Sequence, residues 1–78
     1  MNTILTLTVR VNDIKEAQIL CNAVAAFPYD IDLRQQRYVV DAKSILGILS
    51  LDLGQPMQLD AYTNDVTPLK AALGSFII

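Results

Sequence analysis

The chain has 78 residues, of which 53% are hydrophobic and 18% are charged, and its formal net charge is −2. This composition excludes a disordered chain and predicts one packed domain over residues 1–78. No apolar run approaches the roughly 20 residues of a membrane-spanning helix, and the evenly spread charge offers no basic stripe to a nucleic-acid backbone.

Two features of the sequence bear on its location in the cell. Met1-Asn2 leads directly into a strand-like pattern, so we expect no signal peptide. Cys21 is the only cysteine and cannot form an internal disulfide, which suits a reducing compartment. We therefore expect a cytoplasmic protein.

A strand and a helix are predicted first. Residues 3–10 alternate between apolar and polar side chains, which is typical of a half-buried strand. Asp13, with Glu16 three positions later, matches a variant of the capping box, so a helix is predicted from about Asp13 to Ala26. Its predicted core face comprises Ala17, Leu20, Ala23, Val24 and Phe27. An adjacent stripe, less polar than a solvated face, comprises Ile14, Gln18, Cys21 and Ala25.

A β-hairpin is predicted after Pro28, which stops the helix. Residues 29–34 alternate again, and residues 38–40 return as the partner strand. The turn is expected at Gln35-Gln36, although it lacks the Asn-Gly or Asp-Gly pair that favours tight turns. The hairpin is therefore predicted from its strand pattern alone.

A short apolar helix is predicted to begin at Ser44 and to end near Leu53-Gly54. The Ser44 hydroxyl can accept a hydrogen bond from a first-turn amide, as an N-cap does. The apolar residues behind it lie on more than one side of the helix: Ile45, Leu46, Ile48, Leu49 and Leu51. A small domain cannot bury all of them. We expect Ile48 and Leu51 in the core and the rest of this surface to face water or a partner.

The chain is predicted to end with a strand and a helix. The strand spans residues 57–63, with Met57, Leu59 and Ala61 on one face. Asn64-Asp65 is expected to cap a helix from Val66 to about Phe76. The apolar residues 77–78 are expected to cover the sheet or helix layer, or to join a self-association patch. The order β-α-β-β-α-β-α favours an antiparallel sheet with its helices on one face.

Residues 42–51 resemble the regulatory-serine region of HPr, the small phosphocarrier family of the bacterial sugar phosphotransferase system. The shared pattern is Lys-Ser-Ile-x-Gly-x-x-Ser-Leu, which begins here at Lys43. The same order of elements and nearly the same length extend the resemblance over most of the chain. It implies an α+β fold, the HPr-like open-faced β-sandwich with a four-stranded antiparallel sheet and three helices on one face.

The chain departs from the family at the phosphocarrier motif, Gly-x-His-Ala-Arg-Pro. It contains no histidine, and the resemblance places Asp13 at the histidine position, Lys15 at the arginine and Glu16 at the proline. Two carboxylates in one helical turn suit the helix dipole but repel a phosphate. Histidyl phosphocarrier activity is therefore expected to be absent. Asp13 could itself accept a phosphoryl group, but that chemistry generally requires a divalent cation, and no acidic cluster is evident to hold one.

Ser44 has two interpretations. The resemblance implies phosphorylation by an ATP-dependent HPr kinase, as in catabolite-repression HPr, which also lacks the histidine and keeps the serine. A phosphate there would meet free amides at the helix N-terminus, with Lys43 adjacent. The alternative is that Ser44 serves only as an N-cap.

By position in the family, the partner-binding residues are expected to be Ile14, Lys15, Gln18, Cys21, Lys43, Ile45, Leu46 and Leu49. The implied partners are HPr kinase, a transcriptional regulator or a phosphotransferase-system component, and the chain could also form a homo-oligomer. For Cys21, an inert apolar filler is favoured over a reactive thiol. The alternative function is an HPr-fold interaction module with no phosphorylation and no role in sugar transport. We expect no enzyme activity, metal or cofactor, because no catalytic constellation is evident.

Overall fold

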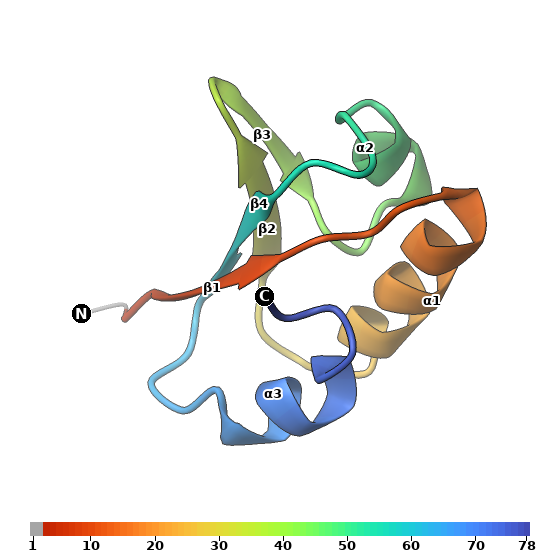
Figure 1. The fold of residues 1–78 in the computed structure, drawn as a ribbon. Helices are drawn as coiled ribbons and strands as arrows, with labels where there is room; N and C mark the ends of the chain where they lie inside the picture. The colour runs from red at the N-terminus through yellow and green to blue at the C-terminus, as the bar shows by residue number, and fades with distance from the viewer. Residues whose placement is uncertain (1–2) are drawn as a thin grey trace.

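The computed structural model describes residues 3–78; Met1 and Asn2, which precede the predicted strand, lie outside the described residues. The elements are β1 (Leu5–Val9), α1 (Ile14–Ala25), β2 (Ile31–Gln35), β3 (Tyr38–Asp41), α2 (Ile45–Leu49), β4 (Met57–Ala61) and α3 (Thr67–Leu73). The strands form one antiparallel sheet in the order β1-β4-β2-β3, and the helices cover one of its faces (Figure 1). The predicted open-faced βαββαβα architecture is confirmed.

The core lies between the sheet and the helices. Leu59 of the central strand β4 pairs with Leu7 of β1 and Leu33 of β2, so the three leucines form a row on the covered face. Ala17, Leu20 and Val24 of α1 are fully buried against this layer, as their spacing predicted. Ala23 and Phe27, predicted with them, are half-buried and pack at the margin of the core. The alternation of each strand therefore determines which face is buried.

Helix α1 begins at the predicted cap. The Asp13 Oδ1 atom accepts a hydrogen bond of 2.8 Å from the Glu16 amide. The Glu16 carboxylate in turn accepts one of 2.9 Å from the Asn12 amide, one residue earlier than in the usual capping box. The first of these contacts uses an amide of the first turn that has no acceptor within the helix.

The β2–β3 turn lies one residue later than predicted. Gln35 pairs with Tyr38, so the turn residues are Gln36 and Arg37, and Gln36 has a φ of 55° in the left-handed region. The reason is the position of the Gln35 side chain. Its amide exchanges two hydrogen bonds with the Asp52 backbone, of 3.0 and 2.8 Å. Gln35 therefore belongs to β2 and fixes the loop after α2.

Helix α2 is shorter than predicted and ends at Leu49 rather than near Leu53-Gly54. The helix ends at the C-cap Ser50, whose amide and hydroxyl both donate to the Gly47 carbonyl. Further along, Gly54 adopts a φ of +87° and its amide donates a hydrogen bond of 2.7 Å to the Val11 carbonyl. A glycine adopts this φ without the steric cost that a Cβ brings. Ile48 and Leu51 are buried, as predicted.

Helix α3 is also shorter than the predicted span of residues 66–76. Its N-cap is Val66 rather than the predicted Asn64-Asp65, although the Asp65 carboxylate, one residue earlier, accepts a hydrogen bond of 2.9 Å from the Thr67 amide. Beyond the helix, the chain returns along β1: the Arg10 amide donates to the Phe76 carbonyl at 2.9 Å, and the Ile78 amide donates to the Thr8 carbonyl at 3.0 Å. The apolar end of the chain thus covers part of a sheet edge.

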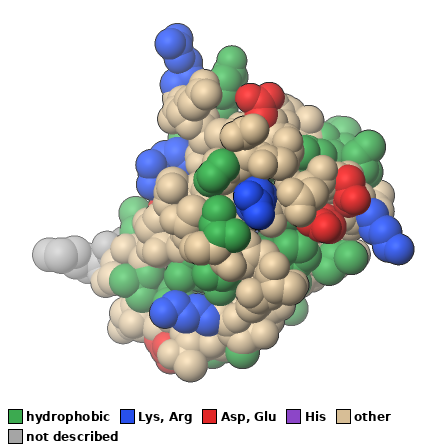
Figure 2. All heavy atoms as spheres, viewed as in Figure 1, with side chains coloured by type: hydrophobic (Ala, Val, Ile, Leu, Met, Phe, Trp, Pro, Cys, Tyr) green, Lys and Arg blue, Asp and Glu red, His purple; other side chains and the backbone are tan. Residues whose placement is uncertain are grey.

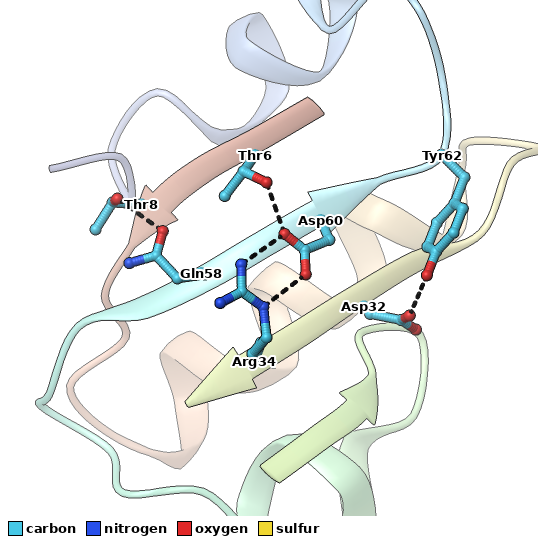
Figure 3. Close-up of polar contacts among 7 residues, drawn as sticks. All are labelled: Thr6, Thr8, Asp32, Arg34, Gln58, Asp60 and Tyr62. Carbon is cyan, nitrogen blue, oxygen red and sulfur yellow. Dashed lines mark hydrogen bonds and ion pairs between the residues drawn. The ribbon is translucent and has the colours of Figure 1, made fainter. Parts of the chain in front are cut away.

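The uncovered face of the sheet is polar. Arg34 makes two hydrogen bonds to the Asp60 carboxylate, of 3.0 and 3.2 Å, and the Thr6 hydroxyl donates a third of 2.7 Å (Figure 3). The hydrogen bonds from Arg34 hold the pKa of Asp60 below its ordinary value, and the Thr6 bond adds to this effect while partial burial opposes it.

This lowered pKa predicts how stability depends on pH. The Asp60 contribution is present above the ordinary aspartate value of 3.8 and is lost as the pH falls through the lower folded-state pKa. Asp60→Asn is therefore expected to reduce the loss of stability between about pH 5 and about pH 2, measured by urea unfolding. Asp52→Asn is the control, because no described residue donates a hydrogen bond to the Asp52 carboxylate. An unchanged pH dependence in Asp60→Asn would contradict the prediction.

Candidate functional site

The candidate site is built around Ser44 at the start of α2. The half-buried Ser44 Oγ atom accepts a hydrogen bond of 3.2 Å from the Gly47 amide, which confirms the predicted N-cap. The preceding turn is fixed by Asp41, whose backbone carbonyl accepts from the Ser44 amide at 3.0 Å. The Asp41 side chain accepts from the Lys43 amide at 2.8 Å. Hydrogen bonds therefore fix both the backbone amide and the side chain of Ser44.

Gly47 allows the first turn of α2 to lie directly against β3. A Cβ atom built on Gly47 would stand 3.1 Å from the Val40 Cβ and 3.4 Å from the Asp41 carbonyl oxygen. The first distance is too short for an unstrained contact. The glycine of the Lys-Ser-Ile-x-Gly pattern thus has a packing role beside the serine.

Lys43 connects the Ser44 turn to the end of α1. Its Nζ atom donates a hydrogen bond of 2.6 Å to the Phe27 carbonyl, two residues after the last residue of α1. A cation is favourable at this end of a helix, where carbonyl groups lack intrahelical partners. Sequence reasoning placed Lys43 beside Ser44 but did not predict this contact, because it joins segments that are distant in sequence.

An apolar surface lies beside Ser44, and we call it the α1–α2 shelf. Leu46 is 78% exposed, Ile14 is 57% exposed and Leu49 is 36% exposed. Helices α1 and α2 pack against each other, and hydrophobic side chains gather over α2 and the start of α1 (Figure 2). Of the predicted partner-binding residues, the shelf comprises Ile14, Lys15, Gln18, Ile45, Leu46 and Leu49.

Cys21 was predicted to lie on this surface, but the structure buries it. It is only 9% exposed and belongs to the core cluster, because α2 packs over this side of α1. Burial raises the pKa of its thiol, and the nearby Asp41 carboxylate raises it further. Both effects disfavour the reactive thiolate, so the structure supports the alternative of an apolar filler. Cys21 reaches the surface only at the floor of a shallow hollow of about 340 Å³, which Gln18, Lys43 and Ile45 also line.

Asp13 lies at the N-terminus of α1 as an occupied cap. Its carboxylate accepts a hydrogen bond from the Glu16 amide, and the next two residues, Ile14 and Lys15, are exposed. Residues 3–78 contain no group of three histidine, cysteine or acidic side chains arranged to hold a metal ion. No helix in the same range has both the length and the apolar character to cross a bilayer.

Comparison with known families identifies the class of protein that this fold and site define. The model of the PTS-HPr family, described as "PTS HPr component phosphorylation site", matches residues 6–73. The chain therefore belongs to the HPr family. No curated protein matches the sequence.

A solved structure supports the same fold. The crystal structure of HPr-C-His from Thermoanaerobacter tengcongensis superimposes with a TM-score of 0.71 and 22% sequence identity. The match covers 95% of this chain and 90% of that chain. The predicted HPr-like fold is confirmed by this similarity.

Proposed function

We propose that this HPr-family protein is not a histidyl phosphocarrier and instead regulates the sugar phosphotransferase or carbon-catabolite system through protein contacts. The observation that carries the proposal is the absence of histidine from all 78 residues. The resemblance places Asp13 at the family's histidine position, and its carboxylate accepts a hydrogen bond from the Glu16 amide. A second carboxylate, that of Glu16, adds negative charge to the same turn.

Ser44 is the proposed site of regulation. Its hydroxyl is partly exposed at the start of α2 and lies beside the shelf in the fold. A phosphoryl group there would add about 1.5 to 2 negative charges next to an apolar docking surface. Such a charge changes which partners the shelf can bind without requiring the domain to refold.

The shelf is the proposed partner surface. Three exposed aliphatic side chains, Ile14, Leu46 and Leu49, suit a contact with another protein better than a small-molecule pocket. The proposed partners are an HPr kinase, a transcriptional regulator or a phosphotransferase-system component, and the proposed location is therefore the cytoplasm. Lys15 and Lys43 contribute positive charge near this surface.

Incubation with an HPr kinase and ATP tests the role of Ser44. We expect intact-mass spectrometry to show one added phosphoryl group, and we expect Ser44→Ala to show none. Ser50→Ala is the matched control, because Ser50 closes the same helix and its hydroxyl donates to the Gly47 carbonyl at 2.6 Å. No incorporation into the native chain, or equal incorporation into Ser44→Ala, would contradict phosphorylation at Ser44.

The second candidate is an interaction module without phosphorylation. Two contacts favour it: the Ser44 hydroxyl already caps α2, and the Lys43 ammonium is bonded to the Phe27 carbonyl. A protein of this kind would use the shelf with a partner or with a second copy of itself. Failure of the kinase to modify the folded chain would favour this candidate.

A further inference from the structure

A second surface feature shares no lining residue with the α1–α2 shelf. It is a hollow of about 460 Å³ between the α1–β2 and β4–α3 connections. Its lining includes Pro28, Tyr29, Asp30, Tyr62, Thr63 and Asn64. We call it the tyrosine hollow. It is open to solvent and combines two tyrosines with several polar side chains.

The walls of the tyrosine hollow are held in place by the fold. The Tyr62 amide donates a hydrogen bond of 3.0 Å to the Asp30 carbonyl, next to the β2–β4 pairing. The Tyr62 hydroxyl crosses to β2 and donates to the Asp32 carboxylate at 3.1 Å (Figure 3). On the other wall, the Tyr29 ring packs against Phe27, with 5.8 Å between ring centroids. Both tyrosine rings are therefore preorganised.

The charged groups around the tyrosine hollow are carboxylates. Asp30 lines it, and no lysine or arginine does so among residues 3–78. The hydrogen bond to Asp32 raises the pKa of Tyr62, and the charges of Asp60 and Asp30 add to that shift. Burial raises the pKa of Tyr29, and the charge of Asp65 adds to it. Of these carboxylates, Asp60 is neutralised by Arg34.

Two tyrosines and one carboxylate, that of Asp30, line the same hollow and together favour a cation. The face of a tyrosine ring attracts an ammonium or guanidinium group placed over it, and a nearby carboxylate adds to the attraction. An anion would be repelled by the Asp30 carboxylate.

We propose that the tyrosine hollow binds an organic cation, a guanidinium or alkylammonium group, against the rings of Tyr62 and Tyr29 and beside the Asp30 carboxylate. Such a group is carried by a basic side chain of a partner protein or by a free polyamine. The inference does not rest on Ser44 or on the shelf.

Amide-resolved NMR titration of the full chain tests the proposal. The probes are N-acetyl-arginine amide, its uncharged counterpart N-acetyl-citrulline amide, and spermidine. We expect the arginine derivative and spermidine to shift the amide signals of Asp30, Tyr62, Thr63 and Asn64, and the citrulline derivative to leave them in place. Tighter binding of the arginine derivative supports a partner side chain, and tighter binding of spermidine supports a free polyamine.

Matched variants distinguish binding in the tyrosine hollow from non-specific attraction to the protein's negative charge. Asp30→Asn and Tyr62→Leu are each expected to weaken binding of the arginine derivative about two- to fivefold, the range of an exposed cation–π contact. Asp52→Asn removes the same charge from an exposed position outside the hollow and should leave binding unchanged. The proposal is overturned if the citrulline derivative produces the same shifts, or if neither cation shifts the amide signals of the residues that line the hollow. It is also overturned if Asp52→Asn weakens binding as much as Asp30→Asn.

Discussion

Leu59→Ala is expected to lower the free energy of unfolding by about 2–5 kcal/mol, the largest effect of any single truncation proposed for this chain. Leu59 is fully buried at the centre of the sheet, between Leu7 and Leu33. Its removal costs the transfer free energy of the lost atoms and leaves a cavity that two flanking strands cannot close. Domains of 78 residues have a total stability of roughly 4 to 12 kcal/mol. The variant should therefore be partly unfolded at modest temperature.

Leu46→Ala is the matched control, because it makes the same chemical change at a position that is 78% exposed. We expect its free energy of unfolding to stay within about 0.5 kcal/mol of the native value. Urea unfolding monitored by circular dichroism measures both variants. Equal destabilisation by the two substitutions would contradict the assignment of Leu59 to the core and of Leu46 to the surface of the shelf.

Gly47→Val is expected to lower the free energy of unfolding by about 1–3 kcal/mol, because it forces side-chain atoms into a packed contact. Even the first added atom would stand 3.1 Å from the Val40 Cβ. The first turn of α2 must then move away from β3, which weakens the cap between the Ser44 hydroxyl and the Gly47 amide. Urea unfolding measures the stability, and faster hydrogen exchange at residue 47 would report the weakened cap.

Gly74→Val provides the control for this prediction. A Cβ atom at Gly74 would meet only the Lys70 carbonyl oxygen, at an ordinary 3.6 Å, and its backbone is already right-handed. We expect a change of no more than about 0.5 kcal/mol there. If Gly47→Val is as well tolerated as Gly74→Val, the close packing of α2 on β3 is not what requires a glycine.

The sequence predicted the fold well wherever local pattern and packing agree. Alternation of apolar and polar residues predicted β1 and β4 together with their buried faces. The Asp13 cap predicted the start of α1. The resemblance around Ser44 then supplied the topology that local pattern alone could only favour. These features were accessible because each depends on residues within a few positions of one another.

The remaining features depend on contacts between distant segments. The β2–β3 turn shifted by one residue because Gln35 is held by the Asp52 backbone. Cys21 was placed on the surface because the stripe on α1 gives no sign that α2 will cover it. The bond from Lys43 to Phe27 and the tyrosine hollow likewise join residues that no short window contains.

The most direct test of the central claim is phosphoryl transfer from phosphoenolpyruvate. The native chain is incubated with phosphoenolpyruvate and the first enzyme of the phosphotransferase system, with a histidine-containing HPr as the positive control, and its intact mass is measured. We predict no added phosphoryl group on this chain and one on the control. A stoichiometric, acid-labile adduct that disappears in Asp13→Asn would contradict the account, because it would make Asp13 a phosphoryl acceptor and the protein a phosphocarrier.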